Sequence, residues 1–200
     1  MIPEQEGTTS KERSADLDLL LVKAKEFHGD ICAGIVLGTR MTMIGMREIG
    51  LNPMERSKNL IVYVEIDRCI ADAIQAITGC SLGHRSLKYL PYGKFAATYI
   101  NLKNGEAVRV SVVEKKRTEK TGQEAMKDAA RILLETPEAD LFRIKKVRVA
   151  IPDGDMPGMP KYHSRCSRCN EMIVDNKEAT VDGAVLCGNC AHGSYYTETP

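Results

Sequence analysis

Two Cys-x2-Cys pairs near the end of the chain constrain its fold more than any other feature. They are CSRC, residues 166–169, and CGNC, residues 187–190. Each pair can turn two sulfurs inward, and a hairpin between the pairs can close a tetrahedron around Zn²⁺. The alternative is two redox dithiols or disulfides. A segment of about 30 residues has too little core to fold alone, so metal binding would supply its folding free energy, on the order of 10 kcal/mol.

We therefore predict a structural zinc ribbon at residues 163–193, followed by a tail at 194–200. Strand-like sequences and an Asp182-Gly183 turn lie between the two pairs. A site closed by four thiolates has no open position for catalysis, so structural support or protein contact is the expected role. The predicted zinc ligands are Cys166, Cys169, Cys187 and Cys190.

Charge and cysteine content narrow the class of protein. The net charge is +1, so no global field recruits nucleic acid or an anionic membrane. The longest apolar runs, such as DLDLLLVKA, are too short to span a bilayer. The first residues, MIPEQEGTTSKERS, contain no apolar core of the secretory kind. Seven cysteines, an odd number, favour thiols and metal over a disulfide framework. We expect a cytoplasmic protein without a membrane or nucleic-acid partner.

The remaining sequence predicts an α+β domain with a mixed or antiparallel sheet flanked by helices. Apolar spacing predicts helices from Ser14 to Phe27, from about Ala33 to Glu48, over 70–77 and over 121–135. Strand-like runs occupy 59–67, 94–101, 107–115 and 142–151. The expected domains are a flexible N-terminus at 1–14, the α+β domain at 15–151 and a linker at 152–162.

Two local signals refine this fold. Asn104-Gly105 predicts a hairpin turn between the second and third strands. Gly34 and Gly38 lie four residues apart and would give the second helix a thin face for close packing.

The stretch FHGDICAGIVLGTR, residues 27–40, raises the question of a second site. Cys32 and Cys69 are both expected at helix N-termini, where the helix dipole lowers a thiol pKa. With His28 and Asp30 they would form a nitrogen and sulfur donor set that suits zinc, iron or nickel. The alternatives are a histidine that complements a helix C-terminus and cysteines that fill the core.

Three motifs, FHGDICAGIVLGTRM, DRCIADAIQAITGCSLGHRSL and YGKFAATY, resemble the FmdE family, which takes its name from formylmethanofuran dehydrogenase. The likeness covers about residues 17–150, and many members of that family end in a zinc ribbon. It implies an α+β domain, a homodimer and a metal pocket in the main domain. The implied ligands are His28, Cys32, Cys69 and Cys80. The resemblance also implies roles for residues around this pocket. Asp72 and Gln75 would be polar residues near the ligands, and Lys94 would contact an anion. Gly79, Gly83 and Gly93 would lie in backbone turns.

The chain also departs from the family pattern. Asp30 stands where the family has a second histidine, and Ala33 where it has proline. His84 replaces an asparagine and Pro91 an acidic residue. Asp30 would either bind the metal or orient His28. Asp72 would either be a further ligand or hydrogen-bond to a ligand. His84 could restore a nitrogen ligand.

Two functions follow from these motifs. The first is an accessory or metal-handling partner of molybdenum or tungsten redox enzymes, with a second transition metal in the main domain beside the ribbon zinc. The second is an enzyme that uses Cys32 or Cys69 as a thiolate and His28 as a base on a small acyl or carbonyl substrate.

Overall fold

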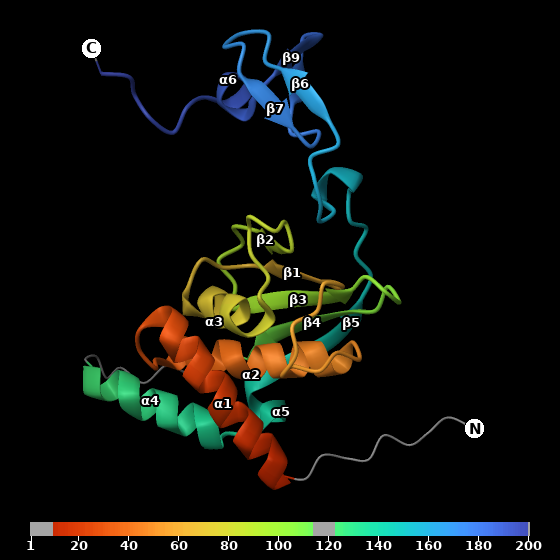
Figure 1. Ribbon diagram of the computed structural model, residues 1–200. Helices are drawn as coiled ribbons and strands as arrows, with labels where there is room; N and C mark the ends of the chain where they lie inside the picture. The colour runs from red at the N-terminus through yellow and green to blue at the C-terminus, as the bar shows by residue number, and fades with distance from the viewer. Residues whose placement is uncertain (1–9, 114–122, 200) are drawn as a thin grey trace. The chain divides into compact units, whose positions relative to one another are not determined.

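A computed structural model of the chain describes residues 10–113 and 123–199 and divides it into two units, at Val149 and Ala150. The first unit is an α+β domain and the second is a small ribbon, so the predicted fold class is confirmed (Figure 1). The helices of the first unit are α1 (Ser10–His28), α2 (Ala33–Glu48), α3 (Cys69–Thr78), α4 (Gln123–Glu135) and α5 (Glu138–Leu141). Its strands are β1 (Leu60–Val64), β2 (Leu87–Tyr89), β3 (Ala96–Asn101), β4 (Ala107–Val112) and β5 (Phe142–Val147).

The five strands form one mixed sheet in the order β2-β1-β3-β4-β5. β1 and β2 run parallel, and the other neighbours are antiparallel. The β3–β4 hairpin confirms the Asn104-Gly105 turn: Gly105 has φ 76° and its N–H donates to the Asn101 carbonyl at 2.8 Å. Strand β2 was not predicted, because three residues are too few to display an alternating pattern.

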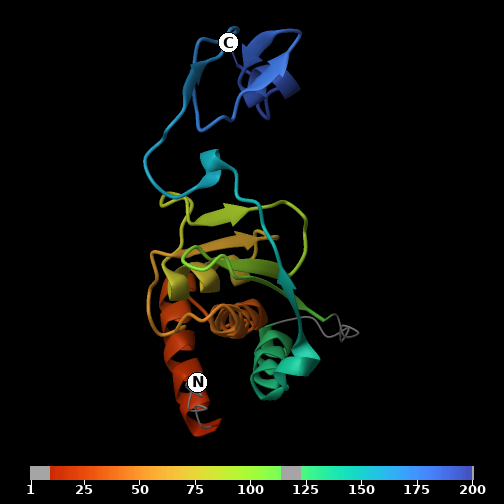
Figure 2. The ribbon, with the colours of Figure 1, turned by 90° about the vertical axis from the view of Figure 1, so that its right-hand side faces the viewer.

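The helices cover one face of the sheet, with α2 at the centre of the helical layer (Figures 1 and 2). Met41 and Ile44 of α2 and Ile74 of α3 pack with Val62 and Tyr99 of the sheet in one buried core. α1 and α4 pack against α2 from outside. The large apolar side chains of α2 are therefore buried between the sheet and the neighbouring helices.

Three glycines let α2 approach its neighbours. A Cβ added to Gly38 would lie 2.8 Å from the Cα of Ile70 in α3, and one added to Gly45 would lie 2.2 Å from the ring of Tyr99. Gly34 similarly faces Cys69. The predicted thin face at Gly34 and Gly38 is thus the packing surface between α2 and α3.

Arg40 of α2 forms hydrogen bonds with the end of α4. Its guanidinium is nearly buried and donates hydrogen bonds to the carbonyls of Leu133 and Thr136, at the end of α4. The last carbonyls of a helix have no partner within the helix, so a charged donor there both caps the helix and complements its dipole.

Some element boundaries differ from the predictions. α1 begins at Ser10, before the predicted start at Ser14, because Lys, Glu, Arg and Ala favour helix without an apolar stripe. β5 ends at Val147, before the predicted end at 151. The rest of the predicted flexible N-terminus, the end of the 107–115 run and the first residues of the 121–135 run lie outside the described residues.

The second unit contains a short 3-10 helix, η1, and two small hairpins. Its elements are η1 (Asp153–Asp155), β6 (His163–Arg165), β7 (Met172–Val174), β8 (Ala179–Val181), β9 (Ala184–Leu186) and α6 (Gly188–His192). η1 falls within the predicted linker but packs on the ribbon. A Cβ on Gly154 would lie 2.3 Å from the Asp175 carbonyl oxygen, and Lys177 pairs with Asp155 at 2.8 Å.

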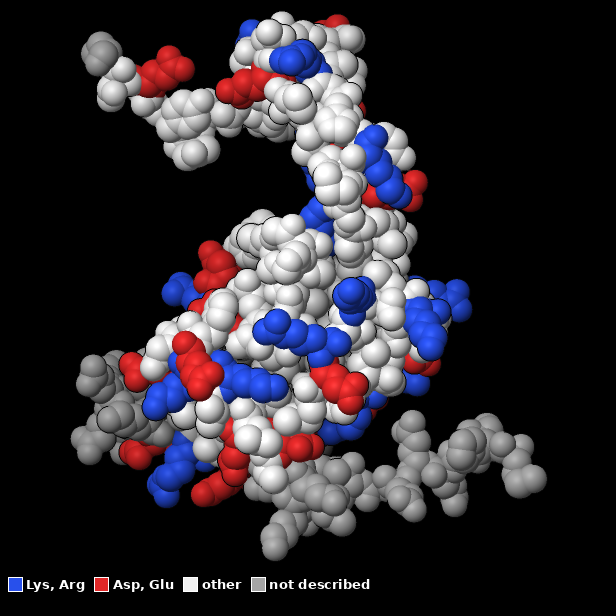
Figure 3. Space-filling view, in the orientation of Figure 1, with Lys and Arg blue, Asp and Glu red and all other residues white. Residues whose placement is uncertain are grey.

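The surface carries both signs of charge. On the face in Figure 3, Lys and Arg side chains are interspersed with Asp and Glu, in keeping with a net charge of +1. Among the described helices, none combines the length and the hydropathy needed to cross a membrane.

Replacing Gly38 by alanine tests the α2–α3 packing. We expect Gly38→Ala to lower the free energy of unfolding by about 1–3 kcal/mol, because the new methyl group would meet the Ile70 backbone, which cannot rotate away. Urea denaturation followed by circular dichroism measures the change. Gly83→Ala is the control, since nothing lies within 4 Å of its added Cβ. Equal stability of the two variants would contradict the close packing.

Candidate metal centres

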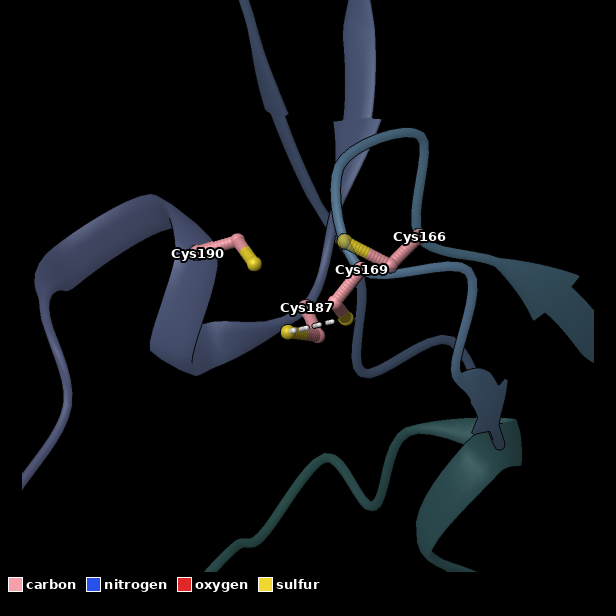
Figure 4. A group of neighbouring side chains, drawn as sticks. All are labelled: Cys166, Cys169, Cys187 and Cys190. Atoms are coloured by element: carbon pink, nitrogen blue, oxygen red, sulfur yellow. Dashed lines mark hydrogen bonds between the residues drawn. The ribbon is translucent and has the colours of Figure 1, made fainter. Parts of the chain in front are cut away.

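The four ribbon cysteines converge on one point (Figure 4). Cys166 and Cys169 flank the turn after β6, and Cys187 and Cys190 lie at the start and within the first turn of α6. Their four sulfurs lie within 4.8 Å of one another, and those of Cys169 and Cys187 are 3.8 Å apart. All four predicted ribbon ligands therefore come together.

Backbone hydrogen bonds shape both turns. The N–H of Asn170, at φ 62°, donates to the Cys166 carbonyl at 2.9 Å, and the N–H of Ala191 donates to the Cys187 carbonyl at 2.9 Å. The buried apolar core of the described ribbon consists of Cys166, Ile173 and Leu186. So small a core supports the prediction that metal stabilises this unit.

The thiol chemistry fits a divalent cation. Backbone N–H groups, chiefly those of Cys169 and Cys187, lower the pKa of the Cys166 thiol to about 6. Burial, followed by the neighbouring cysteine sulfurs, raises the pKa of the Cys190 thiol to about 12. Four thiolates therefore do not coexist at neutral pH unless a cation compensates them, and a tetrahedral set of four sulfurs suits Zn²⁺.

A second cluster lies in the first unit, where three chain segments meet. His28 ends α1, Cys32 is the N-cap of α2 and Cys69 begins α3. One ligand atom from each lies within 4.8 Å of the others, and all three residues are half-buried. The Sγ of Cys32 is 3.9 Å from Nε2 of His28. The structure thus brings together three of the four residues that the family resemblance implied.

Asp72 orients the histidine of this cluster. Its Oδ2 lies 2.8 Å from Nδ1 of His28, on the side of the ring away from Cys32. This hydrogen bond assigns the proton to Nδ1 and leaves Nε2 as a lone-pair donor toward the cysteines. A carboxylate behind a histidine ligand is a common arrangement in metal sites.

Gly34 makes the cluster possible. A Cβ at this position would lie 2.8 Å from the Cβ of Cys69 and 3.7 Å from the Sγ of Cys32. Only a residue without a side chain allows the first turn of α2 to approach the first turn of α3 so closely. The motif Cys-Ala-Gly therefore has a packing reason for its glycine.

The predicted lowering of the Cys69 pKa is wrong. Although Cys69 is at a helix N-terminus, burial, and after it the neighbouring Cys32, raises the pKa of its thiol. Desolvation and a second sulfur outweigh the helix dipole and the backbone N–H at this position.

Cys80, predicted as a ligand, does not join the cluster. It is buried in the main core, with its Sγ 3.7 Å from the Leu60 carbonyl oxygen. Cys69 is the first residue of α3 and Cys80 lies just beyond its last residue, so the ten residues of the helix, about 15 Å, separate them. Motif residues that are close in sequence are therefore separated by a rigid helix.

The other implied residues also lie elsewhere. Asp30 and His84 are exposed and outside the three-residue cluster. Lys94 lies over the Tyr92 ring, 5.8 Å from its centroid. Gly79, at φ 71°, is the C-cap of α3, and Gly93 has φ 66°, so both serve as turns.

Family models match both units. The model described as FmdE, molybdenum formylmethanofuran dehydrogenase operon, matches residues 27–143. The model of the prokaryotic dksA/traR C4-type zinc finger matches residues 160–196. With the four converging sulfurs, the second match supports zinc as the metal of the ribbon.

Two known proteins are similar over most of this chain. A probable S-adenosyl-L-methionine-binding protein of Archaeoglobus fulgidus is 33% identical over 208 residues, which cover 90% of this chain and 54% of that protein. The chain thus spans about half the length of that relative. The crystal structure of a tungsten formylmethanofuran dehydrogenase FmdE-like protein from Syntrophus aciditrophicus matches 90% of this chain and 95% of its own, with a TM-score of 0.58 and 22% identity. The latter shows a shared fold.

Removing one ribbon ligand tests the zinc site. We expect Cys187→Ser to lose one equivalent of zinc per chain and to make the 163–193 segment sensitive to protease, because metal binding supplies its folding free energy. Elemental analysis and mapped proteolysis measure both effects. Cys80→Ala is the control, since Cys80 lies outside both cysteine clusters, and an equal loss of zinc in the two variants would count against the assignment.

Proposed function

The chain belongs to the FmdE family and carries a C4-type zinc finger, and from this premise we propose that it is a metal-binding protein with a second transition-metal site in its first unit. The ligands of that site are His28, Cys32 and Cys69. The observation that carries the proposal is the convergence of two sulfurs and a histidine nitrogen from three helices, with Asp72 holding the imidazole.

The donor set supports zinc, nickel or iron in this site. Thiolate and imidazole are softer ligands than the carboxylates and carbonyls that hold magnesium or calcium. His28, Cys32 and Cys69 would hold such an ion with three protein ligands, one fewer than the four cysteines of the ribbon. An ion held there would supply Lewis-acid chemistry or could be passed to a partner.

The residues around the ligands have separate tasks. Asp72 keeps the proton on Nδ1 of His28, so that Nε2 stays available. Gly34 keeps space for the Cys69 side chain. The His28 and Asp72 side chains are 23% and 38% exposed, so an ion can enter or leave without unfolding of the core.

The cellular role that we propose is metal handling for a molybdenum or tungsten redox enzyme. The family description, which refers to a molybdenum formylmethanofuran dehydrogenase operon, supports this role. A homodimer and a cytoplasmic location belong to the same proposal. The name of the Archaeoglobus relative refers to S-adenosyl-L-methionine, and about half of that protein lies beyond the matched region.

Replacing Asp72 tests the proposed site. We expect wild-type protein to bind two metal ions per chain and Asp72→Asn to bind the second ion about 10–100-fold more weakly, because the amide no longer fixes the histidine tautomer. Competition titration with a chromophoric chelator measures the affinity. Retention of the ribbon ion is the control for folding in each sample.

Asp30→Asn is the matched control, because Asp30 is an exposed carboxylate two residues after His28. It should bind both ions as the wild type does. One ion per chain in the wild type, or the same weakening in Asp30→Asn, would contradict the proposed site.

A second function is favoured by one specific observation. Asp72, His28 and Cys32 form a relay, with 2.8 Å from the carboxylate to Nδ1 and 3.9 Å from Nε2 to the sulfur. This is the order of groups in which a histidine activates a cysteine nucleophile. In metal-free protein the same residues can therefore take the proton from Cys32 for a reaction on a small acyl or carbonyl substrate.

Thiol labelling separates the relay from the metal site. If the relay operates, Cys32 of chelator-treated protein should react with iodoacetamide about tenfold faster than buried Cys80, and His28→Gln should remove the difference. Peptide mapping by mass spectrometry identifies each labelled cysteine. Uniformly slow labelling of Cys32, Cys69 and Cys80 would exclude this second function.

A further inference from the structure

A groove of about 440 Å³ lies in the first unit and is lined by residues of α1 and α3 and of the loops near them. Lys23 and Phe27 of α1 line one wall and Gln75 of α3 the other, with Arg56 and His84 contributed by loops. Its volume is in the range of small-molecule sites. None of His28, Cys32 and Cys69 lines it, so it is a separate feature of the molecule.

Three basic side chains line the groove. Within the described part of the chain, Lys23 and Arg56 make no ion pair or side-chain hydrogen bond, and neither does the imidazole of His84. Glu26 is the carboxylate among the described residues that line the groove. Two permanent cations and a histidine thus face one acid in a recess where an anion would be stabilised.

The side chain of Arg56 packs against Gly79. A Cβ on Gly79 would lie 3.0 Å from both Cδ and Nε of Arg56, so the arginine lies against the bare backbone at the end of α3. The positive φ of 71° at Gly79 also favours glycine at this position. The Arg56 side chain therefore lies against Gly79 where it lines the groove, and the residue remains exposed, so a ligand can reach it.

The groove also has apolar walls. Phe27 is a large aromatic side chain that is 57% exposed, and Met54 and Ile77 lie among the lining residues. An exposed aromatic ring and an arginine that makes no ion pair with a described residue line the same groove, which fits a ligand with both an anionic group and an apolar body.

We propose that this groove binds a small organic oxyanion, a phosphate or carboxylate attached to an aromatic or apolar body. Arg56 receives the oxyanion through its planar fork, and Lys23 adds a second positive charge. The body of the ligand packs on Phe27. Gln75 lies one turn along α3 from Asp72, so a bound molecule lies close to the three-residue cluster but does not depend on it.

Calorimetric titration of the full chain with four probes tests this proposal. Phenyl phosphate and benzoate combine an oxyanion with an aromatic body, inorganic phosphate lacks the body, and benzyl alcohol lacks the charge. We expect phenyl phosphate, benzoate or both to bind more tightly than inorganic phosphate, and benzyl alcohol to bind least. The tighter of the first two identifies the anionic group.

Variants locate the binding in the groove. We expect Arg56→Gln to weaken binding of the tighter probe about tenfold or more, and Lys58→Gln, an exposed lysine of the same loop outside the groove, to leave it unchanged. Phe27→Ala should weaken the aromatic probes and spare inorganic phosphate. Cys69→Ser should bind the probes as the wild type does, which separates this proposal from the metal site.

Three results would overturn the proposal. The first is the absence of binding of both aromatic oxyanions at millimolar concentration by folded protein. The second is unchanged affinity in Arg56→Gln. The third is an equal loss in Lys58→Gln, which would indicate unspecific attraction to surface charge.

Discussion

The close approach of α2 to α3 is the constraint on which the rest of the first unit depends. Gly34 presents bare backbone to the Cys69 side chain, and Gly38 presents it to the Ala73 Cβ and the Ile70 backbone, so the two helices approach closely. The contact at Gly38 places both helices on the sheet core, and the contact at Gly34 places Cys32 beside Cys69. Packing and chemistry therefore rest on the same pair of residues, and a methyl group at either position would disturb both.

The two cysteine clusters differ in what the surrounding protein supplies. The ribbon offers four sulfurs and a core of three buried residues, so the fold of the ribbon needs its metal. The first unit has a large core of its own and contributes a histidine, two cysteines and a carboxylate behind the histidine. Its cluster is formed by helix ends that are already fixed by packing.

The sequence predicted the features that depend on local patterns. The bounds of α2, the Asn104-Gly105 hairpin and the ribbon spacing each follow from residues that are close together in the chain. Features that depend on tertiary geometry were missed or misplaced. Cys80 shares a motif with Cys69 but lies beyond the far end of α3. The choice between Asp30 and Asp72 as the partner of His28 required the packing of α1 against α3, which no spacing reveals. Strand β2 was too short to show a period.

The central claim is that one metal ion is held jointly by three helix ends of the first unit. Crystals of the metal-loaded protein, measured at an absorption edge of the bound metal, test this claim most directly. The account predicts two anomalous peaks per chain, one within the four ribbon sulfurs and one bonded to Nε2 of His28 and the sulfurs of Cys32 and Cys69. A peak in the ribbon alone, or a second peak bonded to other residues, would contradict it.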